Sequence, residues 1–88
     1  MQWYKLSAFS GYSAAQNNLG VLFEENFNTY NGHLAAYVLL KLSSEHGNAT
    51  AKQNFQVFIL RLSNEDKVVF EIKFKECRTI GLKYCNVL

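Results

Sequence analysis

The 88-residue sequence contains no proline, and its five glycines are widely spaced, so no proline-rich or glycine-rich linker divides the chain. The longest apolar runs, such as residues 34–40, are far shorter than the ~20 residues that a membrane-spanning helix needs. The N-terminus also lacks the charged and then apolar pattern of a secretion signal. We therefore expect a single domain, 1–88, that does not enter a membrane and is located in the cytoplasm.

Excess charge is also scarce, since nine Lys and Arg residues stand against seven Asp and Glu residues for a net charge of +2. Nucleic-acid binding is disfavoured, because phosphate contacts need a clustered basic face. Hydrophobic residues make up 49% of the chain and charged residues only 18%. This balance predicts a folded domain with an apolar core rather than a disordered chain.

The chain carries an internal repeat with an offset of 36 residues. Over sixteen aligned positions, 3–18 against 39–54, six residues are identical. About one identity is expected by chance from average composition. A period of 36 residues is typical of solenoids built from helical hairpins. The identical pairs are Lys5 with Lys41, Leu6 with Leu42, Ser7 with Ser43, Gly11 with Gly47, Ala15 with Ala51 and Asn18 with Asn54.

Apolar spacing predicts three helices before residue 63. The first covers residues 13–25, with an apolar face at the i, i+4, i+7 and i+8 spacing from Ala15. A polar turn is expected over 26–32, followed by a helix from Leu34 that is apolar almost all round and ends before Gly47. Asn48 is a good N-cap for the third helix. The expected buried face of that helix is Ala51, Phe55, Phe58, Ile59 and Leu62.

The segment after Ser63 carries two conflicting patterns. Apolar and polar residues alternate over 68–75, which is typical of a strand. However, Ser63 with acids in the next turn is a helix N-cap, and Phe70, Phe74 and Cys77 have helical spacing. We favour a helix that closes the domain with a polar outer face. The residues of that face are Lys67, Glu71, Lys73, Lys75, Glu76 and Arg78.

The residues from Gly11 to Glu24 follow the pattern Gly-x-x-x-Ala-x-x-Asn-Leu-Gly-x-Leu-Phe-Glu, which resembles the signature of the Sel-like repeat, a relative of the tetratricopeptide repeat. The Trp3-Tyr4 pair and the 36–77 segment are also similar to this family, the latter to the terminal section of bacterial members. The resemblance implies an all-α fold: a short α/α solenoid of about two helical hairpins with a C-terminal capping helix. The expected units are a half repeat 1–11, a repeat 12–47, and a final helix and cap 48–88.

Residues that could support chemistry are few. His33 and His46 lie 13 positions apart with no Cys or acidic ligand at metal spacing beside them, so we expect no metal or cofactor. Cys77 and Cys85 are eight positions apart, which on a continuous helix is ~12 Å, too far for a disulfide. We therefore expect reduced, partly buried thiols. Hydrolase chemistry requires Cys77 to meet a histidine in space, and we expect no enzyme activity.

The expected function is non-catalytic protein binding. Stacked hairpins place successive first helices side by side, and their outward residues form a concave face. The resemblance to Sel-like adaptors implies a protein partner in this groove. The alternative is an immunity or antitoxin-like inhibitor that covers the surface of a toxic enzyme. The expected partner-binding residues are Asn17, Val21 and Glu24, with Gln53, Val57 and Leu60 at or near the 36-residue offset.

The N-terminal residues form a further apolar patch. Trp3, Tyr4, Leu6 and Phe9 lie in what should be the second helix of an incomplete hairpin. Repeat proteins need such faces covered. Three partners could bury this patch: the helix at 13–25, the physiological partner, or a second copy of the chain in a two-fold homodimer.

Overall fold

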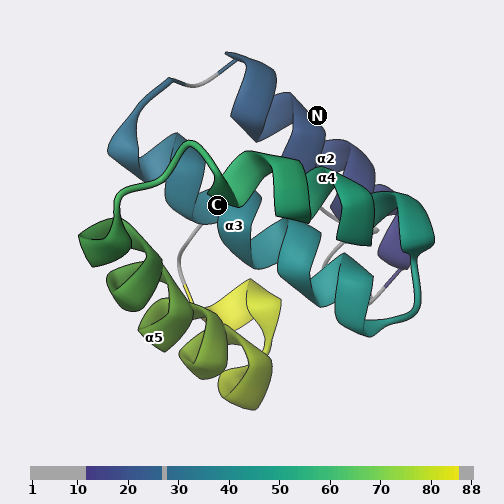
Figure 1. Ribbon diagram of the computed structural model, residues 1–88. Helices are drawn as coiled ribbons and strands as arrows, with labels where there is room; N and C mark the ends of the chain where they lie inside the picture. The colour runs from purple at the N-terminus through teal and green to yellow at the C-terminus, as the bar shows by residue number, and fades with distance from the viewer. Residues whose placement is uncertain (1–11, 27, 86–88) are drawn as a thin grey trace.

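The computed structural model describes residues 12–26 and 28–85, and all their regular structure is helical (Figure 1). The predicted half repeat 1–11 and the Trp3 patch lie outside the described residues. The prediction of an all-α fold is confirmed, and the strand alternative for 68–75 is wrong. The elements are α2 (Ser13–Asn26), α3 (Tyr30–Glu45), α4 (Ala49–Ile59), α5 (Asn64–Ile80) and a short 3-10 helix, η1 (Leu82–Tyr84).

Helix α3 is the centre of the molecule, as its all-round apolar sequence predicts. Every residue from Ala35 to Leu40 is buried. Helix α3 contacts α2, α4 and α5, whereas α4 and α5 pack on α3 more extensively than on each other. Figure 1 shows α2 and α5 on different sides of α3. The core is therefore organised around one helix, and burial of its side chains stabilises all three of its neighbours.

Side-chain caps fix where three helices begin. The Oδ1 atom of Asn48 accepts a hydrogen bond from the Ala51 amide at 2.9 Å, and the Ser63 hydroxyl accepts one from the Asp66 amide at 3.1 Å, so both predicted caps are confirmed. The predicted turn over 26–32 is too long. Thr29 caps α3 by accepting a hydrogen bond from the amide of Gly32 at 3.0 Å, and the helix starts at Tyr30.

The outer face of α5 differs from the polar face that was expected. Phe70, Phe74 and Cys77 are buried against α3, as predicted. Residues two positions from each phenylalanine lie about 200° away around the helix, so Val68 and Ile72 point outward. They are 62% and 65% exposed. The apolar residues that alternate over 68–75 therefore lie on two opposite faces of a helix. Phe70 and Phe74 are on the inner face, and Val68 and Ile72 are on the outer face.

The cysteines form a Cys77–Cys85 disulfide with a Cα–Cα distance of 5.0 Å, so the expectation of reduced thiols is wrong. The expected 12 Å separation assumed one continuous helix. Instead α5 ends at Ile80, and Gly81 adopts φ +99°, a conformation that favours glycine. The chain turns back through η1 and returns Cys85 to α5.

Within the described residues, no helix is long and apolar enough to cross a membrane, in agreement with the prediction from sequence.

Close packing of α2 on α3 makes Gly20 a sensitive position. A Cβ added there lies 2.9 Å from Leu40 Cγ and 3.3 Å from Leu39 Cβ, and both leucines are fully buried. Alanine is normally the better helix former by ~0.5–1 kcal/mol. We nevertheless expect Gly20→Ala to lower the free energy of unfolding by about 1–3 kcal/mol through overpacking. Urea titration followed by circular dichroism measures this, and exposed Asn18→Ala is the control expected to lose nothing.

The disulfide closes a loop between positions eight apart, and loop-closure entropy for that length predicts a stabilisation of about 2–3 kcal/mol. We expect reductant to lower the melting temperature of the parent. The double variant Cys77→Ser/Cys85→Ser should melt at the lower temperature and be indifferent to reductant. Equal melting of the parent with and without reductant, together with two alkylatable thiols, would show that the bond does not form.

Candidate functional site

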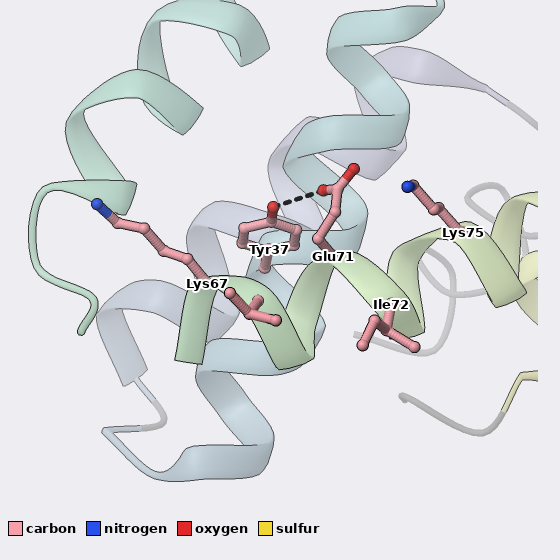
Figure 2. Close-up of a pocket in the computed structure, with 6 residues that line it drawn as sticks. Tyr37, Lys67, Glu71, Ile72 and Lys75 are labelled. Carbon is pink, nitrogen blue, oxygen red and sulfur yellow. Dashed lines mark hydrogen bonds between the residues drawn. The ribbon is translucent and has the colours of Figure 1, made fainter. Parts of the chain in front are cut away.

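An open groove of about 420 Å³ runs along the flank of α5, between its outer face and Tyr37 of α3 (Figure 2). Figure 2 shows Lys67 and Lys75 toward its two ends, with Tyr37 and Glu71 between them. We call this feature the α5 groove. Its lining residues are Tyr37, Lys67, Val68, Glu71, Ile72 and Lys75.

Tyr37 projects from α3 and is held by two aromatic neighbours. Its ring makes edge-to-face contacts with Phe55 of α4 at 5.0 Å and with Phe70 of α5 at 5.7 Å between ring centroids. Such pairs contribute about 0.5–1.5 kcal/mol beyond area burial. The ring is therefore a fixed wall of the groove, shared by three helices.

Glu71 is bound by two donors from α3. The Tyr37 hydroxyl donates to Glu71 Oε2 at 2.6 Å, and Lys41 Nζ donates to the same oxygen and forms an ion pair with it. Lys41 Nζ also lies 4.8 Å from the centre of the Phe74 ring, a cation–π contact. This Tyr37–Lys41–Glu71 network joins α3 to α5 beside the groove.

The network shifts the pKa values of its members in opposite directions. Burial alone raises the pKa of Glu71, but the hydrogen bonds from Lys41 and Tyr37, with the charges of Lys41 and Lys75, outweigh it and lower the pKa. Burial, followed by the hydrogen bond to Glu71 and the negative charge of that residue, raises the pKa of Tyr37 well above its usual value. Glu71 is consequently ionised, and Tyr37 is a neutral donor at neutral pH.

Among the described residues, the two lysines of the groove, like the exposed Lys52 of α4, differ from four cations that form ion pairs. Lys41, Arg61, Lys73 and Arg78 each pair with a glutamate. Among the residues that the structure describes, Lys67 and Lys75 form no ion pair. With Val68 and Ile72 exposed beside them, they leave both positive charge and apolar surface available to a ligand.

The structure gives no support to the hydrolase alternative. Cys77 is disulfide-bonded, so it has no thiolate to act as a nucleophile. His33 packs its ring against Phe58 at 5.8 Å, and His46 lies at the other end of α3, about 20 Å away at 1.5 Å per residue. The described residues also contain no cluster of three or more His, Cys, Asp or Glu side chains that could hold a metal.

Half of the predicted partner-binding residues are engaged within the fold. Asn17 is only 8% exposed, and its Oδ1 accepts a hydrogen bond from Asn54 Nδ2 at 3.1 Å. Glu24 is half-buried and pairs with Arg61 at 3.1 Å, and Val21 packs against the core. The expectation that these three point outward is wrong, because this side of α2 faces α4.

The other three predicted residues lie on α4 and just after it, and they are exposed. Gln53 faces solvent, Val57 is 54% exposed and Leu60 is 80% exposed. These residues remain available to a partner. The structure does not bring them together with Asn17, Val21 and Glu24 as one outward face.

The α5 groove was not predicted, although the sequence carries one signal for it. Lys67, Glu71 and Lys75 recur at intervals of four, and Val68 and Ile72 follow the same interval one residue later. This spacing fits both a solvated polar face, as predicted for the lysines, and the strand-like alternation of the apolar residues. The role of Tyr37 carried no local signal, because it depends on contacts with residues 18 to 34 positions away.

Comparisons of the chain with protein-family models, curated proteins and solved structures found no match. The function proposed below therefore rests on the chain's own residues and on the motif that resembles the Sel-like repeat.

The Tyr37–Lys41–Glu71 network predicts a pH-dependent stability. A lowered folded-state pKa of Glu71 means that its contribution is present above the unfolded pKa, near 4.5, and is lost as pH falls through the folded value. We expect Glu71→Gln to cost about 1 kcal/mol at pH 7 and progressively less below pH ~4.5, since the side chain is partly solvated. Urea titrations of parent and variant from pH 7 to 3 measure this difference.

The matched control is Glu76→Gln on the same helix, where the pair with Lys73 is exposed and spans 3.4 Å. Exposed i, i+3 pairs contribute only about 0.2–0.5 kcal/mol. A Glu71→Gln cost that is the same at pH 3 and pH 7 would mean that the network carries no ionised carboxylate.

Proposed function

We propose that this chain is a non-catalytic protein-binding module and that the α5 groove is its principal binding surface. The observation that carries the proposal is a groove of about 420 Å³ that combines the exposed Val68 and Ile72 with two lysines that pair with no acid in the described part of the chain. Apolar surface in a recess with a charged rim is typical of protein interaction sites.

The rigidity of the groove supports this proposal. Its wall, Tyr37, is fixed by aromatic contacts with α4 and α5, and its central carboxylate, Glu71, is fixed by two hydrogen bonds. A preformed surface loses little conformational entropy when a partner binds. These contacts favour recognition over thiol or metal chemistry, since the described residues supply no free cysteine and no metal cluster.

We further propose that the helices form a short solenoid of about two Sel-like hairpins, capped by α5. Contacts between the first helices of the two repeats support this arrangement. The hydrogen bond between Asn54 and Asn17 joins α4 to α2 close to the 36-residue offset. Ser43, at the end of α3, donates to the carbonyl of Ser13 at 2.6 Å and closes the first hairpin.

The disulfide bears on location. Disulfides persist in oxidising compartments and are rare in the cytosol, where thiols are kept reduced. Both cysteines are 1% exposed, so the bond lies within the core. We therefore propose an oxidising compartment in place of the cytoplasm that the sequence alone predicted.

The test is quantitative affinity capture with the full-length chain as bait. The extract comes from the cells that make the protein, and Ile72→Glu is compared with the parent. We expect proteins retained by the parent to be depleted at least about tenfold with Ile72→Glu, because a charge placed in an apolar contact disrupts it. Ile80→Glu, also on α5 but outside the groove, is the control expected to retain them.

The variant Leu60→Glu distinguishes the α5 groove from the exposed residues Val57 and Leu60 at the end of α4. Depletion with Leu60→Glu and retention with Ile72→Glu would move the binding surface to α4. Circular dichroism of each variant verifies that it is folded. Equal retention by the parent and all three variants would show that neither surface binds a partner.

A further inference from the structure

We infer that the α5 groove takes an extended segment of a partner protein in which an apolar residue lies between two acidic residues, in the pattern acid-x-apolar-x-acid. This inference rests on the proposed protein-binding function and specifies the partner's chemistry. It is carried by the charges and spacing of the groove.

The charges of the groove complement two acidic residues. Lys67 and Lys75 lie toward the two ends of the groove (Figure 2) and form no ion pair among the described residues. The carboxylate between them, Glu71, is already neutralised by Lys41 and hydrogen-bonded to Tyr37. The groove thus presents two positive charges to a ligand. Between them, the charge of Glu71 is balanced by Lys41, and Val68 and Ile72 add apolar surface.

The spacing of the two lysines matches an extended partner segment. Lys67 and Lys75 are eight residues apart on α5, a rise of about 12 Å. In an extended chain, residues i, i+2 and i+4 point to one face, and residues i and i+4 are about 13 Å apart. Two acids at that spacing can reach both lysines, and the apolar residue midway between them lies beside Glu71, next to the exposed Val68 and Ile72.

The same charges disfavour a second copy of this chain. A two-fold antiparallel pairing of α5 centred on Glu71 places Lys67 of each copy against Lys75 of the other. Like charges directly opposed at an interface are unfavourable. A membrane is also a poor match, because Val68 and Ile72 are interleaved with the ionised Glu71, whereas surface-bound helices present a continuous apolar face.

The experiment is a ¹⁵N NMR titration of the full chain with the peptide Ac-Gly-Ser-Glu-Ser-Phe-Ser-Glu-Ser-Gly-NH2. A companion peptide has Gln in place of both Glu residues, and a third has Lys. We expect the acidic peptide to shift the amide signals of residues 67–75 and to bind about three- to tenfold more tightly than the Gln peptide, as two exposed ion pairs predict.

Charge reversal provides the decisive comparison. The double variant Lys67→Glu/Lys75→Glu should lose the acidic peptide and gain the Lys peptide, whereas Lys52→Glu on α4 should keep the parent's preference. Equal binding of the Glu and Gln peptides, shifts that map elsewhere, or binding only to anionic phosphatidylglycerol vesicles overturns the inference.

The capture experiment distinguishes the two failures. Depletion of a partner by Ile72→Glu, with no preference for the acidic peptide, leaves the protein-binding function intact and removes the acid-x-apolar-x-acid specificity. Retention of every captured protein by Ile72→Glu removes the groove as a binding surface, and the inferred specificity with it.

Discussion

Burial of α3 on all sides is the constraint on which the rest of the structure depends. Every residue from Ala35 to Leu40 is excluded from water, so three other helices must cover this one. An ordinary amphipathic helix needs cover on one side only. In a chain of 88 residues, this requirement leaves little freedom: α2, α4 and α5 each place an apolar stripe on α3, and their opposite faces become the surface.

The α5 groove follows from that arrangement. Because α4 and α5 pack chiefly on α3, the Tyr37 ring is shared between them at the place where they meet it. A polar Glu71 can lie there only with partners, which Tyr37 and Lys41 supply from the central helix. The same element that forms the core therefore also forms and rigidifies the recess that we propose as a binding surface.

Local signals made much of the fold predictable from the sequence. The all-round apolar run identified α3, and the caps Asn48 and Ser63 located two helix starts because capping needs only neighbouring residues. The misses depend on contacts across the chain. Asn17 is buried where α2 faces α4, and it accepts a hydrogen bond there from Asn54. Cys85 reaches Cys77 only because the chain reverses at Gly81. The candidate site was missed for the same reason, since Tyr37 belongs to it only through tertiary contacts.

The two ends of the groove are anchored by unlike means. Near Lys67, α5 is started by the Ser63 cap, a single hydrogen bond that is indifferent to redox conditions. Two residues beyond Lys75, the helix is tied at Cys77 by a covalent bond to the returning chain. A reducing environment consequently acts on one end alone: it frees the last turn of α5 to fray and leaves the Lys67 end in place. The helix itself sets the spacing of the two lysines, so reduction removes a support beyond Lys75 rather than the spacing.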